Sequence, residues 1–369
     1  MLKKAVALFL VCAGLAACLS CGKTTNHYLY AAIPNSSQIL AYREDPNSGA
    51  LTPLSSSPFT AGPGVTSIVI HPSKQFFYAA NSGENDISLF TIAVGGGITE
   101  VTPRTSLTPL GGTTPAYLVM DSAGSYLYVG NSESRNILVF SISTTSSSLG
   151  ALTQVGTATL LGMTPLNMVL APSGNFLFVT GGGSPSYIEV FSVNSGVLTL
   201  LQLQQTGLNP YGLAIDPSGS YLYTGNFTDN SISEFSISTS STAVATHTVL
   251  AQLPGSPIGT TYSSPISLLV DNSGKYLYVA NQGSSYISGY AIGTAAGSAG
   301  GLSLLTSSPF AANSQPSLIA IDPDGQYLFV GNQKSAAIES FSLATSSGDL
   351  SEVGSYAVGN TPSSIAVLP

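Results

Sequence analysis

Residues 210–237 read PYGLAIDPSGSYLYTGNFTDNSISEFSI, and the spacing of apolar residues in this stretch recurs along the chain. Seven times an aromatic residue is followed 11 residues later by isoleucine, and three residues after that by a second aromatic, with one copy stretching the first gap to 12. Copies begin every 45 to 55 residues, a period typical of β-propeller blades with about four strands each. The first aromatics are Tyr28, Phe76, Tyr126, Phe176, Tyr221, Tyr276 and Tyr327; the isoleucines are Ile39, Ile87, Ile137, Ile188, Ile232, Ile287 and Ile338; the closing aromatics are Tyr42, Phe90, Phe140, Phe191, Phe235, Tyr290 and Phe341.

Each copy reads as a short series of strands separated by turns. In the quoted stretch, residues 210–215 and 221–224 form the first two predicted strands, and Asp-Pro-Ser-Gly at residues 216–219 forms the turn between them. Residues 232–237 alternate in polarity, which indicates a half-buried third strand, and a weaker fourth strand is expected around residues 248–253. We therefore predict an all-β chain of antiparallel, four-stranded blades.

Polar residues that recur once in each copy are interpreted as turn chemistry and not as catalytic groups. Aspartate can bond the backbone two residues on, and it opens the first turn at Asp121, Asp216, Asp271 and Asp322. His71 fills the same slot in the second copy, so we interpret it as a turn residue and not as a base. Asparagines end several second strands, where we expect them to cap the following turn; they are Asn81, Asn131, Asn226, Asn281 and Asn332.

The two ends of the chain are expected to share one blade. Residues 27–30 read as a second strand with no first strand before it, and residues 362–369 read as a first strand with no second strand after it. We therefore predict a seven-bladed β-propeller in which the C-terminal strand is innermost in a blade whose outer three strands come from residues 27 to about 59. Pairing the ends removes the exposed edges of an open array. Prolines precede the first strands at Pro63, Pro115, Pro165, Pro210, Pro265, Pro316 and Pro362.

The first residues are typical of an export signal. Two lysines precede an apolar run at residues 5–17, which is too short to span a membrane comfortably. Leu15-Ala16-Ala17-Cys18 resembles a bacterial lipobox, in which the cysteine is acylated and becomes the new N-terminus. Cys21 is an alternative acceptor, and cleavage near Ala17 without a lipid is another alternative.

These features predict three segments and a location. We expect a lipoprotein signal peptide at residues 1–17, a lipidated tether at residues 18–26 and the propeller at residues 27–369. The protein would then be exported and anchored to the bacterial envelope, at the outer membrane or cell surface.

Cysteine usage and charge narrow the range of partners. No cysteine follows residue 21, so the exported domain has to fold without disulfides. The formal charge is −8, and about −10 once residues 1–17 are removed, which argues against nucleic acid and against a membrane surface except through the lipid anchor. No Asp-x-Asp-x-Asp loop is present, and we expect neither a metal nor a cofactor. We expect a monomer that binds a small molecule, a glycan or an envelope protein at its channel mouth.

The repeat resembles the seven-bladed propellers of the lactonase family and the related YVTN-repeat proteins. The shared signature is Pro-x-x-x-x-x-Asp-Pro-x-Gly-x-Tyr-Leu-Tyr-Val-x-Asn followed by Ile-Ser-x-Phe, best seen at residues 316–332, 265–281 and 210–226. The resemblance covers roughly residues 27–369 and implies the opening of sugar lactones such as 6-phosphogluconolactone. It also implies histidine just after the blade-opening proline, with arginine and glutamate near the channel mouth.

This chain departs from that pattern at the positions that carry the chemistry. The residues after the prolines are Gly64, Ala116, Leu166, Tyr211, Ile266, Ser317 and Ser363, and the chain has three histidines. Arg43, Arg104 and Arg135 are the only arginines, and none is expected on an innermost strand. A phosphorylated substrate needs converging cations, and hydrolysis needs a general base of suitable pKa.

Strand direction identifies the face on which a site would form. Loops that enter first strands share a face with loops that join second to third strands, and ligands of propellers usually bind at that mouth. The candidate binding residues are Tyr117, Asn167, Tyr211 and Arg135, and the other loop residues expected nearby are Glu84, Asp86, Glu133, Asp229 and Lys334. Glu84 is the candidate general base, with a solvated loop carboxylate as the alternative. The two tyrosines suit a sugar-stacking platform, or they fill a narrow channel.

Three functions remain open at this point. The lipobox, the sparse charge and the lack of an acid–base cluster favour a lipid-anchored binding or scaffold module over an enzyme. A lactone hydrolase with altered site residues is the alternative, and a surface-layer structural protein is the second alternative. A hydrolase is expected to show a carboxylate or histidine within reach of a bound carbonyl, and a binding module a mouth lined by Tyr, Asn and Ser.

Overall fold

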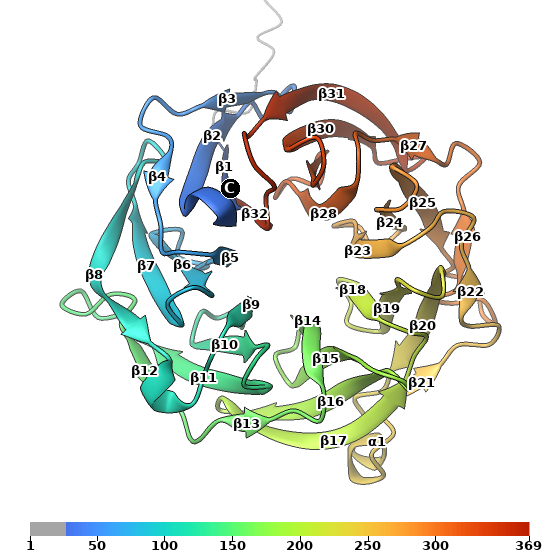
Figure 1. Cartoon of the computed structure of the whole chain (residues 1–369). Helices are drawn as coiled ribbons and strands as arrows, with labels where there is room; N and C mark the ends of the chain where they lie inside the picture. The colour runs from blue at the N-terminus through green and yellow to red at the C-terminus, as the bar shows by residue number, and fades with distance from the viewer. Residues whose placement is uncertain (1–26, 369) are drawn as a thin grey trace, which may run out of the picture.

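The chain folds into a closed ring of seven blades (Figure 1). This computed structural model describes residues 27–368. In every blade the strands are antiparallel; in blades 2 to 7 the first strand in the chain lies innermost and the last lies outermost, which confirms the predicted architecture. The predicted signal peptide, the tether and the acceptors Cys18 and Cys21 lie outside the described residues. Between residues 27 and 368, no helix has both the length and the apolar character needed to cross a membrane.

The blades are numbered here from the N-terminus. Blade 1 contains β1 (His27–Ile33), β2 (Gln38–Glu44), β3 (Leu51–Pro53), β4 (Phe59–Thr60) and β32 (Ser364–Leu368); blade 2 contains β5 (Val65–Ile70), β6 (Phe76–Asn81), β7 (Asp86–Ile92) and β8 (Ile98–Ser106); blade 3 contains β9 (Pro115–Met120), β10 (Tyr126–Asn131), β11 (Asn136–Ile142), β12 (Leu152–Gln154) and β13 (Thr159–Leu160); blade 4 contains β14 (Thr164–Leu170), β15 (Phe176–Gly182), β16 (Tyr187–Asn194) and β17 (Val197–Gln205).

The remaining blades and the helices complete the description. Blade 5 contains β18 (Pro210–Ile215), β19 (Tyr221–Asn226), β20 (Ser231–Ile237), β21 (Leu250–Gln252) and β22 (Ile258–Gly259); blade 6 contains β23 (Pro265–Val270), β24 (Tyr276–Asn281), β25 (Tyr286–Ile292), β26 (Leu302–Leu304) and β27 (Phe310–Ala311); blade 7 contains β28 (Pro316–Ile321), β29 (Tyr327–Asn332), β30 (Ala337–Ala344) and β31 (Asp349–Ala357); the helices are η1 (Pro34–Ser36), η2 (Thr108–Leu110) and α1 (Ser241–Ala245).

The fourth strands are the irregular part of the blades. In blades 1, 3, 5 and 6 the outermost strand is interrupted, so two short pieces pair with the same third strand. The expected fourth strand at residues 248–253 is therefore only three residues long, and α1 lies in the loop before it. The Ser240 Oγ accepts the Ala243 N–H at 3.1 Å, and this N-cap starts the helix.

Blade 1 is built from both ends of the chain, as predicted. β32 pairs with β1 in an antiparallel register that sets Tyr28 opposite Leu368 and Tyr30 opposite Ala366. The outer strands of this blade come from residues 38–60. The C-terminal segment therefore supplies the innermost strand that residues 27–60 lack, and the ring is closed by backbone hydrogen bonds.

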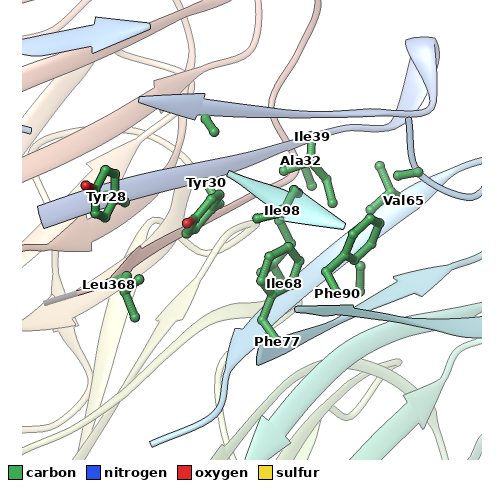
Figure 2. Packing of buried hydrophobic residues seen from close by; sticks show 13 residues of the cluster. Tyr28, Tyr30, Ala32, Ile39, Val65, Ile68, Phe77, Phe90, Ile98 and Leu368 are labelled. Carbon is green, nitrogen blue, oxygen red and sulfur yellow. The ribbon is translucent and has the colours of Figure 1, made fainter. Parts of the chain in front are cut away.

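Each hydrophobic cluster of the molecule joins two neighbouring blades. Figure 2 shows the cluster between blades 1 and 2, where Tyr30, Leu368, Ile68 and Phe77 pack together. The rings of Tyr30 and Phe77 have their centroids 5.3 Å apart. Six further clusters fill the other junctions, and all seven repeat isoleucines are at most 1% exposed. The isoleucine and aromatic positions of the repeat are therefore the core, as the sequence predicted.

A second contact links the blades, between the aromatic residues of one second strand and a glycine in the neighbouring blade. The Tyr223 hydroxyl donates to the carbonyl of Gly300 at 2.8 Å, and the ring of Tyr221 covers the same glycine. Gly300 lies in the hairpin between the third and fourth strands of blade 6, with φ +82. A Cβ there would overlap the Tyr221 ring, so only glycine allows the contact.

This aromatic–glycine contact recurs at six of the seven junctions. The glycines are Gly49, Gly96, Gly150, Gly196, Gly300 and Gly348, each facing an aromatic residue of the preceding blade. Four of the glycine carbonyls accept a tyrosine hydroxyl, from Tyr30, Tyr78, Tyr223 and Tyr278. The exception lies between blades 4 and 5, where Phe178 carries no hydroxyl and α1 occupies the facing hairpin.

The recurring polar residues are part of the turns. Asp216 Oδ1 accepts the backbone N–H groups of Ser220 and Tyr221, which closes the first turn. His71 is buried in the equivalent turn of blade 2, with Nε2 3.0 Å from the Gly124 carbonyl oxygen. Asn226 Nδ2 donates to Ser231 Oγ and Ser233 Oγ at 2.9 Å, so the asparagine holds the second turn from inside the sheet.

Replacing Gly300 by alanine is expected to destabilise the ring far more than replacing Gly297. Both glycines have positive φ, of +82 and +92, but a Cβ at Gly297 meets no atom within 4 Å. Gly297→Ala should cost about 1–2 kcal/mol from the backbone alone, and Gly300→Ala at least about 2 kcal/mol more from the lost blade contact. Urea unfolding of both variants measures the difference. Equal losses would mean that the aromatic–glycine contact contributes nothing to stability.

Removal of residues 362–369 is expected to open the ring, because β1 then loses its only inner neighbour. The truncated chain should lose resistance to protease and unfold over a broad urea range instead of one sharp transition. Limited proteolysis and sedimentation measure both properties. A truncated monomer that resists protease like the full chain would contradict the closure described here.

Candidate functional site

A cavity of about 350 Å³ lies at the centre of the ring, and the innermost strands supply its walls. It is lined by Thr66, Ser67, Ala116, Tyr117, Leu166, Asn167, Tyr211, Ile266, Ser267, Ser317, Leu318, Ile319, Ser363, Ser364 and Ile365. Nine of these residues carry a hydroxyl or a carboxamide, and none of the fifteen carries a charge. We call this space the central cavity.

A bulge at the start of the innermost strands explains why consecutive residues face the cavity. In blade 6, Pro265 pairs with Asn281 and Ser267 pairs with Ala280, so Ile266 is left out of the ladder. Side chains of a regular strand alternate between two faces, whereas a bulge turns the extra residue towards the side of its neighbour. The same shift occurs in blades 2 to 5 and in blade 7.

The register corrects one alignment made from the sequence. We expected Pro63 to open the first strand of blade 2, which would have placed Gly64 in the cavity wall. Instead Val65 pairs with Asn81, as Pro265 pairs with Asn281, so valine occupies the position of proline. The cavity residue of blade 2 is therefore Thr66.

The structure brings three of the predicted binding residues together. Tyr117, Asn167 and Tyr211 come from the adjacent blades 3, 4 and 5, and all three line the central cavity. The Asn167 Nδ2 donates to the Tyr211 carbonyl oxygen at 2.9 Å, and its Oδ1 accepts the Met168 N–H at 2.8 Å. These two bonds fix the orientation of the carboxamide and leave its second amide hydrogen for a ligand.

The two tyrosines present their hydroxyl groups without a protein partner. Among residues 27–368, neither the Tyr117 nor the Tyr211 hydroxyl takes part in a hydrogen bond. The Tyr211 ring packs edge-on against Phe227, with centroids 5.4 Å apart, which orients it. Burial, reinforced by the neighbouring Tyr211, raises the pKa of Tyr117 to about 12. Tyr117 is therefore a neutral hydrogen-bond donor at physiological pH.

The smaller hydroxyl residues of the cavity link neighbouring blades. Ser67, Ser267 and Ser364 accept backbone N–H groups of the next innermost strand, from Leu118, Ile319 and Ile68, at 3.1–3.2 Å. Thr66 and Ser363 donate to carbonyl oxygens of the next blade, those of Pro115 and Val65, at 2.8 and 3.0 Å. Sequence reasoning selected none of these five residues as part of the site; in blades 2 and 6 the register shift that brings consecutive residues to the cavity leaves no signal in the apolar pattern.

The remaining predicted residues lie outside the cavity wall. The Glu84 carboxylate is exposed and pairs at 2.7 Å with Arg104 of β8, the outermost strand of blade 2. Arg104 also contacts Glu100 at 2.6 Å and Asp86 at 3.8 Å, so this arginine is already surrounded by carboxylates. Arg135 is exposed in the turn between β10 and β11. The Glu133 carboxylate accepts the Thr114 hydroxyl at 3.0 Å.

Four glutamates among residues 27–368 are buried, Glu44, Glu189, Glu234 and Glu339, and none was singled out from the sequence. Glu189, Glu234 and Glu339 lie on third strands, and each accepts a backbone N–H at 2.8 Å, from Gly162, Leu302 and Asn313. Burial raises their pKa values, while these hydrogen bonds oppose the rise. None of them lines the central cavity, and their bonds serve to hold loops against the blades.

One group of side chains could in principle hold a metal ion. The ligand atoms of His27, Asp322 and Asp324 lie within 4.8 Å of one another. The Asp322 carboxylate, however, accepts N–H groups of Asp324, Gln326 and Tyr327 in its turn. The Asp322 oxygens are thus already engaged, as in the equivalent turns of other blades. None of the three residues lines the central cavity.

Comparison with known proteins finds one family model that matches nearly the whole propeller. The family model described as "Lactonase, 7-bladed beta-propeller" matches residues 26–164, 166–256 and 245–367. A 6-phosphogluconolactonase of Pectobacterium atrosepticum is 28% identical over 163 residues, covering 44% of this chain and 47% of the relative. A 6-phosphogluconolactonase of Photorhabdus laumondii is 30% identical over 162 residues, covering 44% and 46%. These alignments span about half the length of each curated relative.

A solved structure agrees with the fold over nearly the full length. The periplasmic gluconolactonase PpgL of Pseudomonas aeruginosa superposes with a TM-score of 0.73 and 17% identity, covering 94% of this chain and 99% of that one. At this identity the likeness concerns the fold alone. Because the family model covers nearly all of residues 26–367, the chain belongs to the lactonase family of seven-bladed β-propellers.

Proposed function

We propose that this protein hydrolyses a sugar lactone in the central cavity. The observation that carries the proposal is the pair of phenol groups, Tyr117 and Tyr211, which face the cavity without a hydrogen-bond partner among the described residues. Polar groups that line a concave site and make no hydrogen bond within the protein are available to a ligand. The alignments to 6-phosphogluconolactonases support lactones as the ligand class.

This proposal replaces our expectation of a binding or scaffold module, which was wrong. Family membership and relatives named as lactonases favour the hydrolase. The error came from the test that we set for an enzyme, namely a carboxylate or histidine near the bound carbonyl. A lactone is an ester, and donors placed at the developing oxyanion accelerate its opening without a strong base.

The chemistry needs few groups. A water oxygen bonds to the carbonyl carbon, the ring C–O bond breaks, and the ring oxygen takes one proton while the new carboxylic acid releases another to solvent. Negative charge develops on the carbonyl oxygen in the transition state. The Tyr117 hydroxyl, kept neutral by burial, and the second amide hydrogen of Asn167 are the donors that we assign to this oxygen. Tyr211, on the next blade, is assigned to orient the sugar ring.

We also propose that the enzyme works outside the cytoplasm, attached to the membrane by a lipid on its N-terminal cysteine. The support is the sequence Leu15-Ala16-Ala17-Cys18, together with the lack of cysteine after residue 21. Labelled palmitate should enter the wild-type protein and not the Cys18→Ala variant, with Cys21→Ala as the matched control that keeps the label. Label lost only in Cys21→Ala would move the acceptor, and no label in any form would exclude the anchor.

Tyr117→Phe is expected to lower kcat/KM for lactone opening by about 100-fold, because one donor to the oxyanion is lost. The ratio of wild type to variant should stay constant between pH 6 and 9, since Tyr117 with its pKa near 12 does not titrate there. Rates have to be corrected for spontaneous ring opening.

Two controls make this result specific. Tyr126→Phe removes a hydroxyl from the junction between blades 3 and 4 and should retain full activity. Glu84→Gln should also retain activity, because its carboxylate pairs with Arg104 away from the cavity. Loss of hydrolysis in Glu84→Gln with full activity in Tyr117→Phe would contradict the site.

A further inference from the structure

We infer that the central cavity selects an uncharged, hydroxyl-rich lactone and discriminates against its phosphorylated form. This inference rests on the proposed function and specifies its substrate class. It starts from the cavity wall, where none of the fifteen lining residues is charged. A phosphate monoester carries a charge of about −1.5 to −2 at neutral pH. Such a group would enter the cavity without a counter-ion from the wall.

The positively charged side chains in the surrounding loops do not supply the counter-ion that the cavity wall lacks. Arg104 is committed to Glu84, Glu100 and Asp86 on the outer part of blade 2. Arg135 and Lys334 are exposed in turns between second and third strands, and neither reaches the cavity wall. The protein as a whole is acidic, with a formal charge of −8, which disfavours the approach of an anion. Burial of an unpaired anion is strongly unfavourable.

The wall instead offers both donors and acceptors for hydroxyl groups. Ser67, Ser267 and Ser364 accept backbone N–H groups, so their own hydroxyl hydrogens remain to donate into the cavity. Thr66, Ser317 and Ser363 donate to backbone carbonyl oxygens, so their lone pairs remain to accept. A ligand that carries several hydroxyls can use both sets at once.

Apolar side chains alternate with these polar groups around the ring. Leu166, Ile266, Leu318 and Ile365 line the same cavity, and the Tyr211 ring lies among them. The C–H faces of a sugar ring pack on such surfaces, while its hydroxyl groups reach the serines and threonines. The cavity of about 350 Å³ lies near the lower end of the range for small-molecule sites, roughly 300–1,000 Å³.

The experiment compares kcat/KM for glucono-1,5-lactone and 6-phosphogluconolactone, each corrected for spontaneous opening. The wild type should favour the uncharged lactone by at least about tenfold. Ile266→Lys places a cation at the cavity wall and should shift the ratio towards the phosphorylated lactone by about tenfold or more, while Ile266→Met, of similar length and neutral, should leave it unchanged. Ala116→Lys, on another blade, repeats the test if Ile266→Lys does not fold.

The outcomes separate this inference from the function beneath it. If neither lactone is opened faster than in buffer, the proposed function fails and the inference fails with it. If the phosphorylated lactone is preferred, the protein is still a lactonase and the selectivity argument alone is overturned. If both lysine variants fold and leave the ratio unchanged, wall charge does not control selection, and the inference is equally overturned.

Discussion

The ring depends on a contact in which an aromatic residue of one blade covers a glycine in the next. The glycine lacks a Cβ, so the ring can lie directly on its backbone, and in four junctions a neighbouring tyrosine hydroxyl bonds its carbonyl oxygen. Because the same contact recurs at six of the seven junctions, those neighbouring blades meet in the same way. The apolar clusters between the blades then pack around a geometry that this contact has already set.

The sequence predicts those parts of the structure that repeat. Aromatic and isoleucine positions such as Tyr221 and Ile232 recur at constant spacing, so blade number, strand order and core could be read without a structure. The glycines that face the aromatic residues could not, because they lie in hairpins of variable length whose composition resembles that of any loop. α1 was missed for the same reason, since five residues after a Ser N-cap are too few to show a helical period.

The candidate site also contains some residues that the sequence predicted and others that it did not. Tyr117, Asn167 and Tyr211 were predicted together because strand direction alone places the starts of first strands on one face. Serines such as Ser267 and Ser317 were not selected, because the register shift that brings consecutive residues to the cavity is set by pairing with Asn281 and its equivalents and leaves no signal in the apolar pattern. Glu84 was chosen for its chemistry, and its partner Arg104 lies on an outermost strand that the repeat does not define. The residues that would select a ligand therefore lie at positions that differ from blade to blade.

The closure of blade 1 also bears on when the molecule can fold. The Ser363 backbone N–H donates to the Ala32 carbonyl oxygen at 3.0 Å, across 331 residues of chain, and β32 covers the inner edge of β1. During synthesis, β1 is made long before its pairing partner β32, so that edge stays open until residue 368 has appeared. Open edges are sites where strands of other chains can add. The chain therefore stays open to misassembly until β32 has been made, however quickly the single blades form.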